Sequence, residues 1–189
     1  MGSYYYLVAQ LPSLIYEQSP PMSSVDFLKL AESFMNKKDM ELFGQLALDA
    51  DYTKTTGCGF IDKYRNWEYS MRQNLAVQRA IKLKREAPVE TNYRFDAAAA
   101  ASKAMDETSP LEGELVLDKA RWYTIDDLAG NDIFTRNYLY SYYLKLLLIE
   151  RREAFSVDKG FSEYKSLYAS ILEKHNESKS EEETQGEHA

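Results

Sequence analysis

Few residues of this 189-residue chain have side chains that could do chemistry. The two histidines, His175 and His188, lie at the polar C-terminal end, so the predicted folded part has no histidine to act as a general base or metal ligand. The single cysteine, Cys58, stands between two glycines that could expose it. A nucleophilic thiolate needs a neighbouring base or cation, which only two nearby lysines could supply. A catalytic Cys58 is therefore disfavoured.

Two pairs of acidic residues could serve as general acid and base or bind Mg²⁺. The pair Asp49 and Asp51 is explained by the polarity of a loop, and the pair Asp126 and Asp127 by the first turn of a capped helix. The chain has no glycine-rich phosphate loop and no ExxH pattern of a di-iron bundle. The sequence therefore predicts no catalytic residue, no cofactor and no metal.

A polar seam in one predicted helix is more informative. Glu68, Arg72 and Arg79 share one helix face at helical spacing, and Trp67 and Asn74 lie beside them. The preferred interpretation is a solvated face with ion pairs inside the helix. The alternative is a partly buried charged network at a contact with another protein chain. In that second case, these five residues form a predicted interaction site.

The other elements are expected to pack around residues 133–155, which lack Gly and Pro and are rich in Leu and Tyr. Apolar residues recur there at helical spacing and also fill the remaining directions, so this helix should be buried nearly all round. Its apolar run is too short and too interrupted by charge to span a membrane. The sequence predicts an all-α protein, an irregular helical bundle around this central helix.

Residues 3–14 fit a strand or a helix equally well, because a short apolar run does not distinguish the two. Ser23, with Asp26 three residues later, predicts the start of a helix. Asp39 is predicted to cap a further helix over residues 40–48.

Residues 60–86 form the second long helical pattern. Residues 92–106 contain five consecutive alanines, which favour a helix that neighbouring helices can approach closely. Residues 108–117, interrupted by Pro and Gly, are predicted to form a connection. Thr124, with an acidic residue three positions later, is predicted to cap a short helix that Gly130 closes.

Composition indicates one helical domain over residues 1–175, ending in an amphipathic helix over residues 161–172. The net charge is −7, of which the segment 176–189 contributes −4 through five Glu and one Lys. That segment is predicted to be a disordered acidic tail. The remaining −3 disfavours a nucleic-acid partner. One cysteine excludes an internal disulfide, and the chain begins without the features of a secretory signal, so a cytoplasmic location is expected.

The segments SYYYLVAQLPSL and SSVDFLKL precede an acidic loop and a helix that carries an E-x₅-N pattern. In these features the chain resembles a small bacterial family whose genes accompany those of V-type ATPases. That family is more remotely similar to the C-type stalk subunit of archaeal-type V-ATPases, the counterpart of the d-type subunit of the eukaryotic enzymes. The matching residues are Glu68, Asn74, Leu75 and Arg79 in the first long helix and Tyr142, Leu144, Leu146 and Arg151 in the second, followed by Phe155 and Gly160. On this resemblance the two long helices could be halves of a degenerate helical duplication.

The resemblance implies a non-catalytic all-α subunit that connects the central rotor stalk to the membrane rotor ring. We therefore expect a non-catalytic subunit or assembly factor of a bacterial V-type ATPase or ATP synthase, with stalk and ring subunits as partners and no cofactor. Contact with the ring would place the protein at the inner face of the cytoplasmic membrane without inserting it.

Three other function classes compete with this expectation. A generic helical adaptor of an unrelated assembly would share every compositional feature, so only the identity of its partner would distinguish it. An enzyme would depend on Cys58 or on the acid pair Asp49 and Asp51. An RNA-binding protein would show steeply salt-dependent binding, which the negative charge disfavours.

Overall fold

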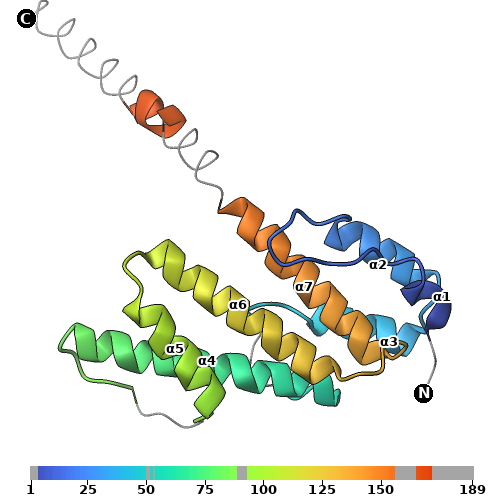
Figure 1. The fold of residues 1–189 in the computed structure, drawn as a ribbon, viewed down its shortest axis with the longest axis horizontal. Helices are drawn as coiled ribbons and strands as arrows, with labels where there is room; N and C mark the ends of the chain where they lie inside the picture. The colour runs from blue at the N-terminus through green and yellow to red at the C-terminus, as the bar shows by residue number, and fades with distance from the viewer. Residues whose placement is uncertain (1–3, 50–51, 53, 89–92, 156–164, 172–189) are drawn as a thin grey trace, which may run out of the picture. The chain divides into compact units, whose positions relative to one another are not determined.

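The computed structural model describes residues 4–49, 52, 54–88, 93–155 and 165–171, and no strand occurs among them. Its helices are α1 (Tyr5–Val8), α2 (Ser24–Glu32), α3 (Lys37–Glu41), the 3₁₀ helix η1 (Leu42–Gln45), α4 (Gly59–Lys82), α5 (Phe95–Asp106), α6 (Pro110–Ala129) and α7 (Arg136–Ala154) (Figure 1). The all-α prediction is confirmed. Residue contacts divide the chain into two units, residues 1–150 and 151–189, and each is described by itself.

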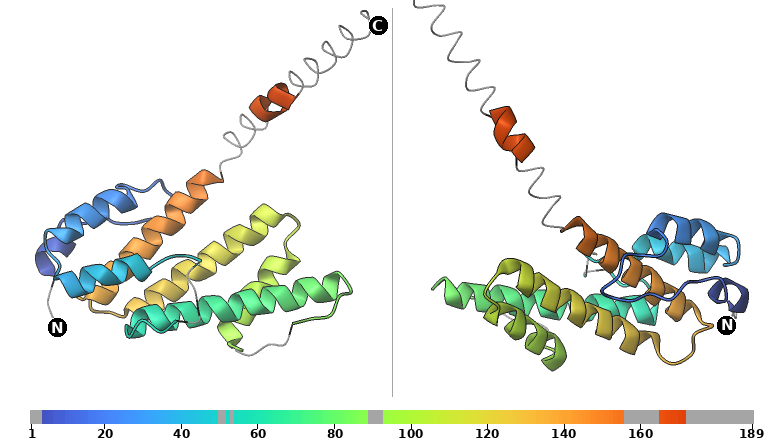
Figure 2. Two further views of the ribbon diagram at one scale, coloured as in Figure 1. Left: turned by 180° about the vertical axis from the view of Figure 1, so that it is seen from behind. Right: turned by 45° about the horizontal axis from the view of Figure 1, so that its top comes forward.

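Helix α7 is the central helix that the sequence predicts. It lies between the N-terminal helices and α6 (Figures 1 and 2). Eight of its residues are buried, and they point in several directions around the helix axis: Leu139, Tyr140, Ser141, Tyr142, Leu144, Leu146, Leu148 and Ile149. The helix begins at Arg136 and not at residue 133, because residues 133–134 form a turn after α6. Burial on all sides explains why the apolar pattern covers nearly every face of α7.

The first unit contains two groups of buried apolar side chains. The larger group surrounds α7 and includes side chains from α1, α2, η1, the first turns of α4 and the end of α6. The smaller group lies between α4, α5 and α6 and consists of Trp67, Met71, Leu75, Ala97, Ala101 and Leu117. Helices α4 and α6 contribute to both groups, so these two helices join one core to the other.

Helix α5 runs in the same direction as the second half of α4. The backbone N–H of Arg94 donates to the Ser70 hydroxyl at 3.0 Å, and the Lys82 ammonium donates to the carbonyl of Met105. Two members of the alanine run, Ala97 and Ala101, are fully buried against α4. Their lack of side-chain bulk therefore lets the two helices pack closely, as the sequence predicts.

Helix α6 corrects two predictions. Residues 108–117 are not simply a connection, because α6 starts at Pro110, where the Ser109 hydroxyl and the Glu112 carboxylate form a reciprocal capping box. Proline at the first helical position needs no N–H partner. Thr124 is not an N-cap either, since it lies inside α6. Gly130 does follow the end of this helix, at a φ of 74° that favours glycine.

In the N-terminal helices, one predicted cap is confirmed and the other is wrong. Ser23 caps α2 by accepting a hydrogen bond from the Asp26 backbone N–H, as predicted. The prediction that Asp39 caps the next helix is wrong: Asn36 caps α3, and Asp39 lies buried within it. Part of the ambiguous segment 3–14 is helical, namely α1 (Tyr5–Val8).

In the second unit, the guanidinium of Arg151 lies over the Phe155 ring at 5.5 Å. Residues 165–171 are helical, and Leu167, Tyr168 and Ile171 are exposed on this segment. The rest of the predicted helix 161–172 and the predicted tail 176–189 lie outside the described residues. The predicted boundary between residues 175 and 176 therefore stays a prediction, as does the helical duplication.

Replacing Gly113 with Ala should lower the free energy of unfolding by about 1–3 kcal/mol. A Cβ atom at this position of α6 would lie 2.9 Å from the backbone oxygen of Ala104, so α5 and α6 would have to separate. The better helix propensity of Ala, about 1 kcal/mol, offsets only part of this cost. Urea unfolding followed by circular dichroism measures the change. Gly44→Ala is the control, because nothing lies within 4 Å of its Cβ position, and an equal effect of both substitutions would contradict the close approach.

Candidate interaction site

The five residues of the predicted interaction site lie on α4, but they do not share one surface. Trp67, Glu68 and Asn74 are buried, whereas Arg72 and Arg79 are exposed. The preferred interpretation of Glu68 as part of a solvated face is wrong, although its predicted ion pair with Arg72 is present, with 2.8 Å between Glu68 Oε1 and Arg72 Nε. The proposed role of the five residues in binding another chain stays a prediction.

Glu68 is the centre of a buried ionic network inside this chain. Arg121 of α6 donates from Nη2 to Glu68 Oε1 and from Nε to Glu68 Oε2, both at 2.9 Å. Asp118 accepts from Arg121 Nη1 at 2.6 Å. Two carboxylates and two guanidiniums therefore balance in charge. The network lies between Tyr64 and Met71 on α4 and between Leu117 and Ile125 on α6, where the two cores meet.

The protonation of the groups around Glu68 follows from burial and from this network. Burial disfavours a charged Arg121, but the hydrogen bonds from Glu68 and its negative charge outweigh that effect and raise the pKa of Arg121. Burial, followed by the charge of Glu68, raises the pKa of Tyr64 and raises that of Tyr52 to about 12. Arg121 thus stays ionised, and both tyrosines stay neutral at physiological pH.

Two arginines of α4 also hold the preceding segment in place. Arg65 donates to the backbone oxygens of Gln45 and Lys54 at 2.7 and 2.9 Å, and Arg72 donates to that of Leu48 at 3.0 Å. These contacts account for Arg65 and Arg72. The face therefore has a structural role in this chain.

A second polar cluster surrounds Asp39. Its side chain accepts hydrogen bonds from the Tyr4 hydroxyl at 2.5 Å, from Asn36 Nδ2 at 2.9 Å and from Arg136 Nη1 at 2.9 Å. The hydroxyl of Tyr140 donates to the Asp39 backbone oxygen at 3.0 Å. Burial opposes ionisation of Asp39, but these hydrogen bonds outweigh it and lower its pKa. Asp39 thus links α3, the N-terminal residues and α7.

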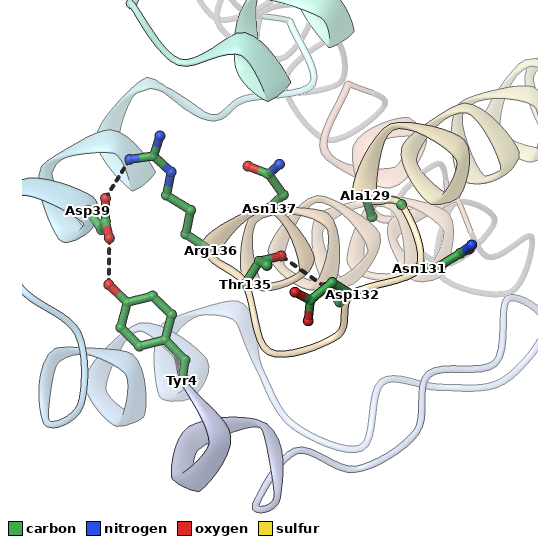
Figure 3. A pocket seen from close by; sticks show the side chains of 9 residues that line it. Tyr4, Asp39, Ala129, Asn131, Asp132, Thr135, Arg136 and Asn137 are labelled. Carbon is green, nitrogen blue, oxygen red and sulfur yellow. Dashed lines mark hydrogen bonds and ion pairs between the residues drawn. The ribbon is translucent and has the colours of Figure 1, made fainter. Parts of the chain in front are cut away.

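Arg136 and Tyr4 also line a pocket of about 340 Å³, which we call the junction pocket (Figure 3). Its full lining is Tyr4, Asp39, Ala129, Gly130, Asn131, Asp132, Thr135, Arg136 and Asn137. Figure 3 shows Tyr4, Asp39 and Arg136 on one side, facing the turn that carries Asn131 and Asp132. The pocket therefore lies where α6 ends and α7 begins.

An exposed apolar surface lies next to this pocket. The rings of Tyr5 and Phe134 are 5.1 Å apart, and those of Tyr5 and Tyr6 are 5.8 Å apart. Tyr5, Tyr6 and Ile133 are 56%, 75% and 45% exposed. We call Tyr5, Tyr6, Ile133 and Phe134 the aromatic patch. The N–H of Tyr4 donates to the Phe134 oxygen at 2.9 Å, which fixes α1 against the turn before α7.

Within the part of the chain that the structure describes, the residues that the sequence offered for catalysis do not form an active site with the clusters described above. Cys58 is buried, so the prediction that flanking glycines could expose it is wrong. Asp126 pairs with Lys145 of α7, and the Lys145 ammonium lies 4.4 Å from the Trp122 ring centre. Both groups therefore help to join α6 to α7. Among the described residues, no group of three or more His, Cys, Asp or Glu could hold a metal ion.

Sequence reasoning missed Arg121 and Asp118, the partners of Glu68. The signal that could have found them is the pattern Ser109, Pro110, Glu112, which marks the start of α6 and makes residues 118 and 121 neighbours on one helix face. Asp39 gives no comparable signal, because its partners Tyr4 and Arg136 are distant in sequence.

Replacing Glu68 with Gln should lower the free energy of unfolding by about 3–5 kcal/mol, because it leaves the buried Arg121 without a full counter-charge. Replacing Arg72 with Gln should cost less than about 1 kcal/mol, since its side chain is 42% exposed. Urea unfolding of both variants tests this difference. Equal costs for Glu68→Gln and Arg72→Gln would contradict the buried network.

Replacing Tyr4 with Phe should lower the free energy of unfolding by about 1–2 kcal/mol at neutral pH, through loss of the hydrogen bond to Asp39. Burial, and then the hydrogen bond and charge of Asp39, raise the pKa of Tyr4 to about 12, whereas an unfolded tyrosine titrates near 10. The unfolded chain therefore loses this proton first. The stabilisation is complete below about pH 10 and is lost as the pH rises through about 12.

Urea unfolding of wild type and Tyr4→Phe between about pH 8 and pH 12 measures this effect. The stability difference between the two proteins should narrow above about pH 10. Tyr123→Phe, at an exposed position of α6, is the control and should show no such trend. A difference that stays constant over this range would contradict the assigned coupling of Tyr4 to Asp39.

Comparison with known proteins identifies no relative of this chain. It matches no family model, no curated protein and no solved structure. Within the described residues, no helix combines the length and the apolar character needed to cross a bilayer.

Proposed function

We propose that this chain is a non-catalytic subunit or assembly factor of a bacterial V-type ATPase or ATP synthase. In this role it would help to couple the central stalk to the membrane rotor ring, as the C-type stalk subunit does. The proposal follows from the resemblance of its helical segments to the small bacterial family encoded with V-type ATPases. It requires that some surface of the chain bind another protein.

The observation that carries the proposal is the aromatic patch. Three of its four side chains are exposed, and Arg136 of the adjoining pocket is partly exposed. Tyrosine and arginine are enriched at protein interfaces and among the residues that contribute most to binding free energy. A tyrosine ring provides a large apolar contact while its hydroxyl keeps a hydrogen-bonding group at the rim. These features support docking of a stalk or ring subunit on the patch.

The residues next to the aromatic patch hold it in a fixed position, which also favours this surface as the binding site. Tyr4, directly before α1, is held by Asp39 and by the backbone of Phe134. The rings of Tyr5 and Phe134 are thus presented by segments anchored to the buried core around α7. An interface on ordered residues loses less conformational entropy when it binds a partner than one on loose segments does.

Affinity purification of the tagged protein from gently solubilised membranes of its native host tests the proposal, with mass spectrometry of the co-purified proteins. We expect stalk and ring subunits of the V-type ATPase. Tyr6→Ser should reduce their recovery by about tenfold, because truncating a buried interface tyrosine costs about 1.4 kcal/mol or more. Tyr123→Ser, a change of the same kind at an exposed position of α6, should leave recovery unchanged.

Recovery of the tagged protein alone, with the ATPase intact in the same extract, would refute the proposal. Specific recovery of an unrelated assembly that depends on Tyr6 would instead identify a helical adaptor. Equal loss with Tyr6→Ser and Tyr123→Ser would mean that the aromatic patch is not the binding surface.

A further inference from the structure

The junction pocket adjoins the aromatic patch and has two unlike walls. One wall is formed by Ala129 and Gly130 at the end of α6, where backbone carbonyls have no partner in the next helical turn, together with Asp132. The other is formed by Tyr4, Asp39 and Arg136. Figure 3 shows the Asp132 side chain on the turn that faces this second wall.

The charges that line the pocket do not balance. The lining contains two carboxylates, Asp39 and Asp132, and one guanidinium, Arg136. Arg136 pairs with Asp39 at 2.9 Å, and Asp39 also accepts from Tyr4 and Asn36. The exposed side chain of Asp132 accepts only from the backbone N–H of Phe134, at 3.1 Å, and it has no basic partner among the described residues. One negative charge in the pocket is therefore left for a ligand.

The helix ends add no net preference to this balance. The carbonyls at the end of α6 carry partial negative charge, while the first N–H groups of α7 carry partial positive charge. These two effects oppose each other in the same pocket. The carboxylate of Asp132 is thus the charge that decides which group the pocket takes.

We propose that the junction pocket binds the guanidinium group of an arginine side chain of a partner protein that docks on the aromatic patch. A guanidinium presents donors in a planar fork that matches a carboxylate, and it stacks on aromatic rings better than an ammonium does. Asp132 accepts from it, and the amide oxygen of Asn137 and the carbonyls at the end of α6 can accept its remaining donors. The pocket volume, about 340 Å³, accommodates such a side chain.

The net charge of the chain supports a basic partner. Charges of opposite sign across an interface increase the rate of encounter and fix its register. Residues 1–175, which include the pocket, carry a net charge of −3, so they attract basic surfaces more than acidic ones. The inference rests on docking through the aromatic patch, as in the proposed function, but not on the identity of the partner.

The test is a titration of the full chain with N-acetyl-argininamide, which carries a guanidinium as its only charge, followed by two-dimensional amide NMR. We expect shifts at Gly130, Asn131 and Asn137 that weaken as salt is added. Asp132→Asn should weaken binding by about tenfold or more, because a charge-assisted hydrogen bond is lost. Asp127→Asn removes the same charge from an exposed position of α6 outside the pocket and should bind like wild type.

Binding that is unchanged in Asp132→Asn, or no shift at these amides in wild type, would overturn the proposal. So would stronger shifts at the same amides with acetate, which would identify an anion site at Arg136. N-acetyl-lysinamide should bind more weakly than the arginine compound, and the reverse order would also contradict the assignment. The tagged chain could capture the ATPase while the full chain fails to bind N-acetyl-argininamide. That result would refute the arginine pocket but not the proposed function.

Discussion

The buried ion pair between Glu68 and Arg121 is the constraint on which the arrangement of α4 and α6 depends. A carboxylate removed from water is tolerated only where donors surround it, and here the fork of Arg121 and the side chain of Arg72 supply them. Because the fork accepts only one placement of the two helices, it sets their register. The two apolar cores meet at this point, so an error in register would misplace both of them.

A second buried carboxylate, Asp39, also holds helices together through directional hydrogen bonds. Asp39 joins three segments that are far apart in sequence, through Tyr4, Arg136 and the Tyr140 hydroxyl. Apolar packing around α7 does not select one orientation for the short N-terminal helices, since rings and leucines can repack at similar cost. Directional hydrogen bonds to one buried carboxylate do select it. The aromatic patch and the junction pocket therefore have a defined position relative to α7.

The charged residues of α4 have a structural role, whereas the surface near the start of α7 is available for binding. Most of the polar groups on α4 are used to hold this chain together, which explains their spacing without a partner. Around α7 the polar groups are satisfied on one side of the junction pocket and left open on the other, at Asp132. Exposed aromatic rings are enriched at protein interfaces. This contrast directs the proposed binding function to the N-terminal end of α7.

The sequence by itself determined the helical class, the central helix and the position of α4, because each depends on local periodicity and on the absence of helix breakers. It also determined the cap at Ser23 and the close-packed alanines of α5. The capping box predicts the start of α6 correctly. Pro110 and Gly113 led instead to the prediction of a connection, because these residue types usually interrupt helices. Only the tertiary structure decided that Glu68 is buried, that Asp39 is a hub and not a cap, and that a pocket forms beside Asp132. The partners of Glu68 and Asp39 in other segments of the chain lie 35 to 101 residues away, a distance over which sequence periodicity carries no information.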